Sequence, residues 1–196
     1  LKAKMHLHTK KANGTLVPPV EALEIFEKGE GRALAKEIAD KGITLVKDTQ
    51  KLLPLNPKKQ KNIYMVVIGD KPGYHNVRGD YAPLFVQKLE EKGFNVTVYD
   101  GEDQNAAIGK MPIEEFKKKY DVILYFCNIE TSGSDSAARI TWPGKRATVP
   151  QMIHDVPTMM VSIDNPYHLL DAPRIPTYIN AYTSEDIVVE TLAEKI

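Results

Sequence analysis

The sequence lacks the features that mark several large classes of protein. Its 196 residues include a single cysteine, Cys127, so no internal disulfide can form, and the apolar run around it predicts a buried, inert thiol. Basic and acidic residues number 26 each, and this zero net charge argues against a nucleic-acid partner, which usually requires a basic excess. No apolar run is long enough to cross a bilayer, so no membrane partner is expected, and no signal peptide is visible.

Motifs for phosphate, metal and serine-hydrolase chemistry are also missing. No G-x-G-x-x-G follows the apolar run at 63–69, and the pair Gly144-Lys145 lacks the earlier glycine and the following Ser or Thr of a P-loop. His6 and His8 have no obvious further metal ligands, and no G-x-S-x-G elbow is present. The sequence therefore predicts no cofactor and no metal.

Apolar runs typical of strands alternate along the chain with amphipathic segments typical of helices. The expected strands span 43–48, 63–69, 95–100, 121–129, 157–164 and 176–182. The expected helices span 29–42, 80–94, 112–120 and 184–196, the last with Thr183 or Ser184 as its N-cap. This alternation predicts βαβ units, and therefore a three-layer α/β/α sandwich with a mostly parallel sheet.

The chain divides into a lead-in and one domain. Residues 1–29 combine weak periodicity and charge with helix breakers, which indicates a linker from something upstream. Residues 30–196 carry the expected sandwich. Because the chain begins with Leu1 rather than methionine, we expect a fragment of a longer protein, and the sequence leaves open whether that protein is cytoplasmic or secreted.

Polar residues follow the expected strands at their carboxyl ends, where ligands of such sheets bind. They are Asp70, Asp100, Asn128, Glu130, Asp164 and Asn165. The turn at Asn165-Pro166 ends a strand, and its amide is also able to hold a sugar or a neighbouring loop. We expect His154-Asp155 to have a surface or interface role, because adjacent side chains diverge.

A long polar loop follows the expected strand at 121–129, and loops of this length are usually functional or disordered. Glu130 opens the loop and is the acid candidate. Arg139 and Trp142 form an arginine–aromatic pair that suits a sugar rim, a domain interface or ordinary loop packing. The sequence leaves these three roles open.

Several motifs resemble glycoside hydrolase family 3. The first two look like the exit from that family's catalytic barrel and the entry into its second domain, and the others are similar to the end of its β-N-acetylhexosaminidase branch. The motifs are LKAKMHLH (1–8), RALAKEIADKGITLVKDTQKLLPL (32–55), RITWPG (139–144), HDVPTMMVSIDNPYHLLDAP (154–173) and PTYINAY (176–182). The chain thus resembles the C-terminal α/β sandwich domain of a bacterial β-N-acetylhexosaminidase, strongly at both ends and weakly over 70–120.

The resemblance implies retaining glycoside hydrolysis by an Asp nucleophile and an acid/base. In that family the nucleophile lies on an N-terminal TIM-like barrel, which needs typically ~250 residues and does not fit in this chain. The acid/base is a His-Asp pair on a barrel loop in one branch and a Glu on the second domain in the β-glucosidase branch. Glu130 lies near that Glu, but the surrounding IETSGSDSAAR does not match its loop. No catalytic residue is therefore carried over, and the chain alone is expected to be inactive.

The implied partners are the chain's own N-terminal barrel, absent here, and an N-acetylglucosamine-containing glycan at the domain interface. The candidate rim or interdomain residues are Asn128, Glu130, Arg139, Trp142 and Asn165. Two alternatives stay open: a scaffold domain that touches no substrate, and a doubly wound domain that binds a small ligand. The sugar linkage and the choice between hydrolysis and phosphorolysis are also open. If the chain is an accessory or a scaffold domain that packs on a barrel, we expect an exposed apolar patch, because the partner domain is missing.

Overall fold

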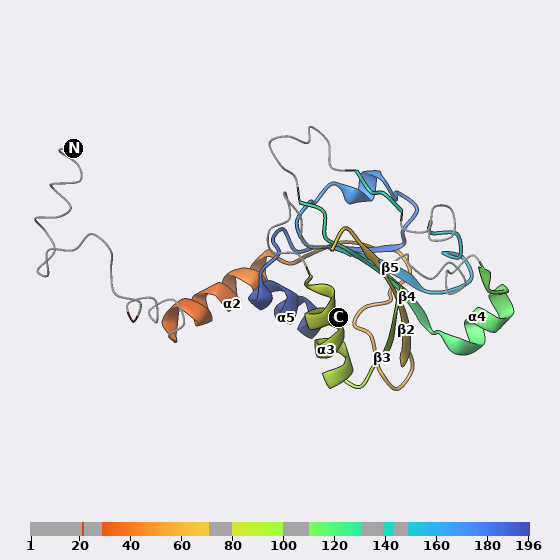
Figure 1. Ribbon diagram of the computed structural model, residues 1–196, viewed down its shortest axis with the longest axis horizontal. Helices are drawn as coiled ribbons and strands as arrows, with labels where there is room; N and C mark the ends of the chain where they lie inside the picture. The colour runs from red at the N-terminus through yellow and green to blue at the C-terminus, as the bar shows by residue number, and fades with distance from the viewer. Residues whose placement is uncertain (1–20, 22–28, 71–79, 100–109, 131–138, 143–148) are drawn as a thin grey trace, which may run out of the picture. The chain divides into compact units, whose positions relative to one another are not determined.

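The computed structural model describes residues 21, 29–70, 80–99, 110–130, 139–142 and 149–196 (Figure 1). Contacts divide the chain into two compact units, Leu1–Glu37 and Ile38–Ile196. Helix α2 (Glu30–Gly42) begins in the first unit and ends in the second. The sheet and the helices that pack on it belong to the second unit.

Within the described residues, six strands form one sheet in the order β1-β6-β5-β4-β2-β3. They are β1 (Thr44–Asp48), β2 (Asn62–Ile68), β3 (Asn95–Tyr99), β4 (Val122–Cys127), β5 (Thr158–Ser162) and β6 (Thr177–Asn180). Among these strands, β1 alone runs antiparallel to its neighbour, β6, and the other adjacent pairs are parallel. The sheet is therefore mostly parallel, as the alternation predicted.

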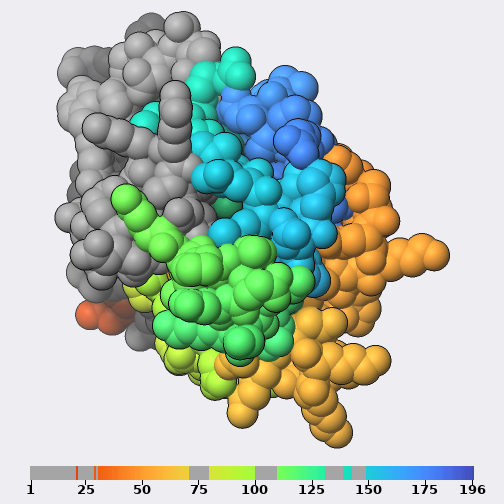
Figure 2. Space-filling view, turned by 90° about the vertical axis from the view of Figure 1, so that its right-hand side faces the viewer, coloured from red at the N-terminus to blue at the C-terminus, as the bar shows by residue number. Residues whose placement is uncertain are grey.

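Helices cover both faces of this sheet. The remaining helices are α3 (Ala82–Glu91), α4 (Ile113–Lys119), α5 (Asp186–Lys195) and a 3₁₀ helix, η4 (His168–Leu170). Helices α3 and α5 pack on one face, where the rings of Phe85 and Phe126 lie 5.0 Å apart. Helix α4 packs on the other face, and Figure 2 shows it (green) beside the segment that follows residue 149 (cyan). The three-layer α/β/α sandwich is confirmed.

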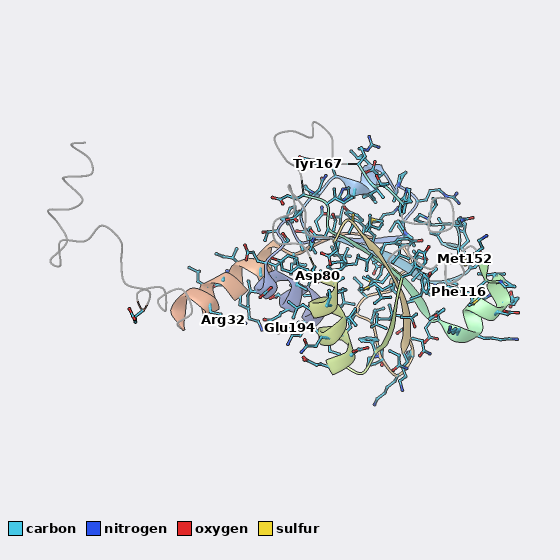
Figure 3. The ribbon with its side chains drawn as sticks, in the orientation of Figure 1. Arg32, Asp80, Phe116, Met152, Tyr167 and Glu194 are labelled. Atoms are coloured by element: carbon cyan, nitrogen blue, oxygen red, sulfur yellow. The ribbon has the colours of Figure 1, made fainter. Side chains whose placement is uncertain are left out.

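The central strands β4 and β5 are mostly apolar, as strands with both faces covered require. Every residue of β4 and β5 is buried. Alternate side chains of β4 enter opposite cores: Phe126 contributes to the α3/α5 core and Tyr125 to the α4 core, where Phe116 and Met152 also lie (Figure 3). Fully burying one such apolar side chain contributes roughly 1.5–3 kcal/mol, so these two cores dominate the stability of the fold.

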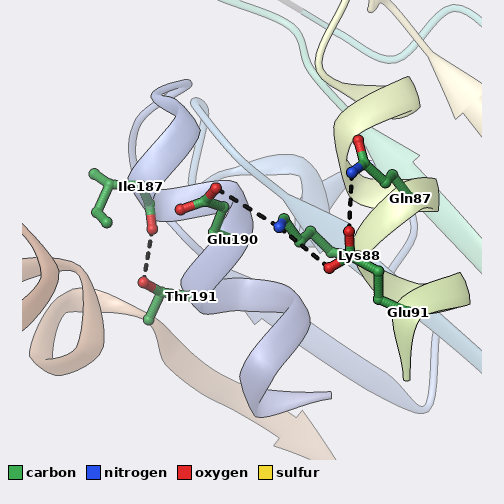
Figure 4. Close-up of polar contacts among 6 residues, drawn as sticks. All are labelled: Gln87, Lys88, Glu91, Ile187, Glu190 and Thr191. Carbon is green, nitrogen blue, oxygen red and sulfur yellow. Dashed lines mark hydrogen bonds and ion pairs between the residues drawn. The ribbon is translucent and has the colours of Figure 1, made fainter.

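Helices α3 and α5 are also joined by polar contacts (Figure 4). The Lys88 Nζ lies 3.9 Å from a carboxylate oxygen of Glu190. The Lys92 Nζ donates to the carbonyl oxygens of Ala193 (2.8 Å) and Glu194 (3.2 Å), at the end of α5 where a cation complements the helix dipole. Surface ion pairs add little, so apolar packing is the main link between the two helices.

The start of α5 differs from the sequence prediction. The N-cap is Glu185 rather than Thr183 or Ser184, and no side-chain hydrogen bond caps the helix. The Ser184 backbone N–H instead donates to Asp164 Oδ1 at 2.9 Å. Ser184, which local propensity predicts as the N-cap, is therefore bound to Asp164 at the carboxyl edge of the sheet and does not cap α5.

Candidate functional site

The carboxyl ends of β2 and β4 meet where the strand order reverses. After β2 the chain adds β3 on one side and then returns to place β4 on the other side. Ligands of doubly wound sheets bind in the crevice at such a position. Gly69 and Asp70 follow β2 here, and Asn128 follows β4.

Asp70 is buried, and its carboxylate caps the N-terminus of α3. Its Oδ1 accepts hydrogen bonds from the backbone N–H groups of Asp80 (3.2 Å) and Tyr81 (3.0 Å), and its Oδ2 accepts one from Ala82 (2.6 Å). Asp80, labelled in Figure 3, has a φ of +86° at the entry to the helix. The first N–H groups of a helix have no partner within it, and the Asp70 carboxylate supplies one. Both oxygens of this strand-end residue are therefore engaged in holding α3.

Asn128 is fully buried beside Asp70. Its Nδ2 donates to Asp70 Oδ1 at 2.5 Å, which fixes the orientation of the amide. Its Oδ1 accepts no hydrogen bond from any residue that the structure describes. The backbones of Gly69 and Asn128 also approach closely. Only glycine fits at position 69, at φ +75°, because a Cβ there would lie 2.6 Å from the Asn128 carbonyl oxygen. Asn128 therefore links β2 to β4 and keeps one acceptor at the switch point.

Asp164 and Glu130 add negative charge to the same edge. Asp164 is half-buried, and its Oδ1 accepts the Ser184 N–H. Burial raises the pKa of Asp164 above its usual value, hydrogen bonds from Ser184 oppose the shift, and the charges of Glu130 and Asp70 reinforce it. Glu130 itself is exposed. The edge thus carries one exposed carboxylate, Glu130, and two that are less exposed, Asp164 and Asp70.

Asn165 forms the turn that ends β5. Its Oδ1 accepts the Tyr167 N–H at 2.9 Å, and its carbonyl oxygen accepts the Ser162 hydroxyl at 2.6 Å. The residue is 6% exposed. Asn165 therefore shapes the turn from inside and presents little surface.

A buried polar cluster under this turn was not identified from the sequence. His168, on η4, lies with its Nδ1 2.9 Å from Ser162 Oγ and 3.3 Å from Cys127 Sγ. Because the Ser162 hydroxyl donates its one proton to the Asn165 carbonyl, the 2.9 Å contact assigns the imidazole proton to Nδ1. Burial raises the pKa of the Cys127 thiol well above its usual range, which agrees with the expected inert cysteine. Spacings of six and 41 residues within this cluster gave no sequence signal.

Arg139 and Trp142 lie in the part of the long loop that the structure describes, and they have separate partners. The Arg139 Nε donates to Asp171 Oδ1, and the Ile140 N–H donates to the other oxygen of Asp171 at 3.2 Å. The Trp142 ring packs edge-on against Tyr125, with centroids 5.8 Å apart. Asp171 thus holds the segment 139–142 on the α4 side of the sheet. Asp100, the remaining strand-end candidate, lies outside the described residues.

Four of the five candidates fall into two groups, and Asn165 lies apart from them in the turn after β5. Asn128 and Glu130 lie with Asp70 and Asp164 at the switch point, whereas Arg139 and Trp142 lie against Asp171 and Tyr125. His154 is exposed, and its Nε2 accepts a hydrogen bond from Arg174 at 2.9 Å. In the described part of the chain, no group of three or more His, Cys, Asp or Glu residues could hold a metal ion. Nor does any described helix have the length and apolarity to cross a membrane.

Comparison with known proteins shows which enzymes this chain is similar to. No family model matches the chain. A curated relative from Cellulomonas fimi, described as "Beta-N-acetylglucosaminidase/beta-glucosidase", is 35% identical over 98% of this chain and 34% of its own length. The solved "Beta-glucoside phosphorylase BglX" bound to 2FGlc superposes with a TM-score of 0.80 at 38% identity, over 99% of this chain and 34% of that one.

A more distant structure shares the fold alone. The glycoside hydrolase family 3 β-N-acetylglucosaminidase from Paenibacillus sp. str. FPU-7 gives a TM-score of 0.59 at 17% identity, over 85% of this chain and 30% of that one. This chain therefore spans about a third of the length of the relatives that it matches.

Proposed function

Because this chain belongs to glycoside hydrolase family 3, as the C-terminal α/β domain of its members, we propose that it serves an enzyme that cleaves β-glucosides or β-N-acetylglucosaminides. The observation that carries this proposal is a match over 98% of the chain that covers only 34% of the relative. In this proposal the remaining length supplies a catalytic barrel with the nucleophile. This chain is the accessory domain, and the carboxyl edge of its sheet packs on that barrel.

The carboxylates at this edge support an accessory role. A retaining glycosidase with an enzyme nucleophile needs a free carboxylate for that role, and a second carboxyl group roughly 5–5.5 Å away is the usual acid/base. Both oxygens of Asp70 are engaged by backbone N–H groups, and Asp164 is enclosed and holds Ser184. Of the three described carboxylates at the switch point, only Glu130 is exposed. We therefore assign no nucleophile to this edge.

The substrate we propose is a glycan with β-linked N-acetylglucosamine, bound where the two domains meet. The motifs at 139–144 and 154–173 favour the β-N-acetylhexosaminidase branch, and the Cellulomonas fimi relative carries both activities in its description. Phosphorolysis stands beside hydrolysis, because the relative at 38% identity is a phosphorylase. Glu130, Arg139 and Trp142 are the proposed rim, since each keeps exposed or half-exposed surface.

A scaffold role without substrate contact is the second candidate. It is favoured by the internal partners of the candidate residues: Asn128 binds Asp70, Asn165 binds its own turn, and Arg139 binds Asp171. A residue consumed by such contacts contributes to stability more directly than to substrate binding.

Kinetics of the full-length polypeptide that carries this chain separate the two roles. The variants are Glu130→Gln and Trp142→Ala, with exposed Glu90→Gln as the matched control. A rim role predicts a several-fold rise in KM for both variants, because binding contacts to the sugar are lost. Thermal stability should stay unchanged in Glu130→Gln, whereas Trp142→Ala also loses its packing on Tyr125, so its KM is measured at a temperature where the variant is fully folded. Unchanged kinetic constants in both variants would contradict the rim role and leave the scaffold role.

A further inference from the structure

Two large apolar side chains stand out of the turn that follows β5. Tyr167 is 69% exposed and Leu170 is 75% exposed, more than any other large apolar side chain in the described part of the chain. Tyr167 is the N-cap of η4 and Leu170 is its last residue, so they stand at positions i and i+3, which eclipse one another in a 3₁₀ helix and point to the same side. Figure 3 shows Tyr167 at the outer rim of the domain. We call these two residues the Tyr167–Leu170 knob.

The knob is connected to the sheet through buried contacts. Between its two residues, His168 is buried and contacts Ser162 of β5 and Cys127 of β4. The backbone closes the turn, because the Leu170 N–H donates to the Tyr167 carbonyl oxygen at 2.9 Å. Leu169 is half-buried and packs on the α4 core, so the two residues between Tyr167 and Leu170 fix the knob to the sheet.

Polar groups surround the knob. Asp171 follows it and holds Arg139, whose side chain is 69% exposed. Asn180, which is itself buried, donates from its Nδ2 to the Pro166 carbonyl oxygen at 3.3 Å and supports the turn from inside. Protein interfaces have this arrangement, with apolar anchors at the centre and a polar rim that includes arginine.

We propose that the Tyr167–Leu170 knob is the anchor through which this domain docks on the catalytic domain of the longer polypeptide. The inference rests on the proposed function, since the occupant is the two thirds of the relatives' length that this chain does not cover. A preorganised Tyr–Leu pair loses little conformational entropy on docking, and tyrosine is enriched among residues that dominate interface energy. The knob lies on the turn after β5, at the same carboxyl edge as the proposed glycan rim.

Calorimetry of the full-length polypeptide tests this inference. The variant is Tyr167→Ser/Leu170→Ser, and the matched control is Val98→Ser, whose valine is 47% exposed on β3. In the docked protein we expect wild type and control to unfold in one transition. In the double variant, the transition of this domain separates and falls by roughly 5 °C or more. In the isolated chain, the same variant melts within about 2 °C of wild type, because both side chains are already exposed.

The outcomes are distinguishable. If the double variant of the full-length protein unfolds in the same single transition as the wild type, the knob is not the docking anchor, and the accessory role still stands. A dimer of the isolated chain that the double variant abolishes would assign the knob to a second copy and would also overturn the proposal. Leu170→Lys repeats the test with one residue in case the double variant fails to fold. A gene that encodes no further domain would refute the proposed function itself.

Discussion

Replacing Asp70 with alanine tests how the switch point is built. The Asp70 carboxylate accepts hydrogen bonds from three backbone N–H groups at the start of α3 and from Asn128 Nδ2. Loss of a helix cap costs about 1–2 kcal/mol, and a buried amide left without its acceptor costs about 1–3 kcal/mol. We therefore expect Asp70→Ala to lower the free energy of unfolding by about 2–5 kcal/mol, a large share of the ~5–15 kcal/mol of a typical domain.

The assay is urea unfolding followed by circular dichroism and by the fluorescence of Trp142, the single tryptophan. The matched control is Asp155→Ala, because Asp155 is exposed, and its expected change is within about 0.5 kcal/mol. The midpoint should fall with an unchanged slope, since the fold and the surface exposed on unfolding stay the same. A loss below about 1 kcal/mol for Asp70→Ala would refute the reasoning, because it would mean that the four hydrogen bonds add nothing net.

Three further predictions follow from the described contacts. Asp171→Ala should release the 139–142 segment and shift the emission of Trp142 to longer wavelength, because the ring loses its packing on Tyr125; an unchanged spectrum would count against Asp171 as the anchor. Burial opposes ionisation of Asp48, but hydrogen bonds from Thr177 and nearby backbone hold its pKa below the usual value. Its contribution is therefore full above pH ~4 and is lost as the pH falls through the lowered pKa, so Asp48→Asn should flatten the acid limb of the stability curve. Cys127 should resist thiol reagents in the native chain and react once urea unfolds it; fast native labelling would contradict its burial.

The fold was predictable because its signals are local. The run at 121–129 is apolar at nearly every position, as a strand covered on both faces requires, and β4 (Val122–Cys127) lies within it. Alternation of such runs with amphipathic segments fixed the layer order. The same local patterns placed Asp70 and Asn128 at strand ends.

The roles of those side chains were not predictable, because they depend on contacts between distant positions. Asp70 was a ligand candidate from its place after a strand, yet the structure uses it to cap α3 ten to twelve residues later. His168 reaches Cys127 across 41 residues, and Arg139 reaches Asp171 across 32. Spacings of this kind carry no periodicity that a sequence reader can use. Propensity also misplaced the N-cap of α5, since Ser184 serves Asp164 instead.

The most direct test of the accessory-domain account is turnover by the isolated chain. The substrates are 4-nitrophenyl β-N-acetylglucosaminide and 4-nitrophenyl β-glucoside, each with and without inorganic phosphate. The account predicts no turnover above the buffer rate by this chain under any of the four conditions, with activity appearing in the full-length polypeptide. Robust turnover by the 196-residue chain alone would contradict it, because a complete catalytic site would then lie within this domain.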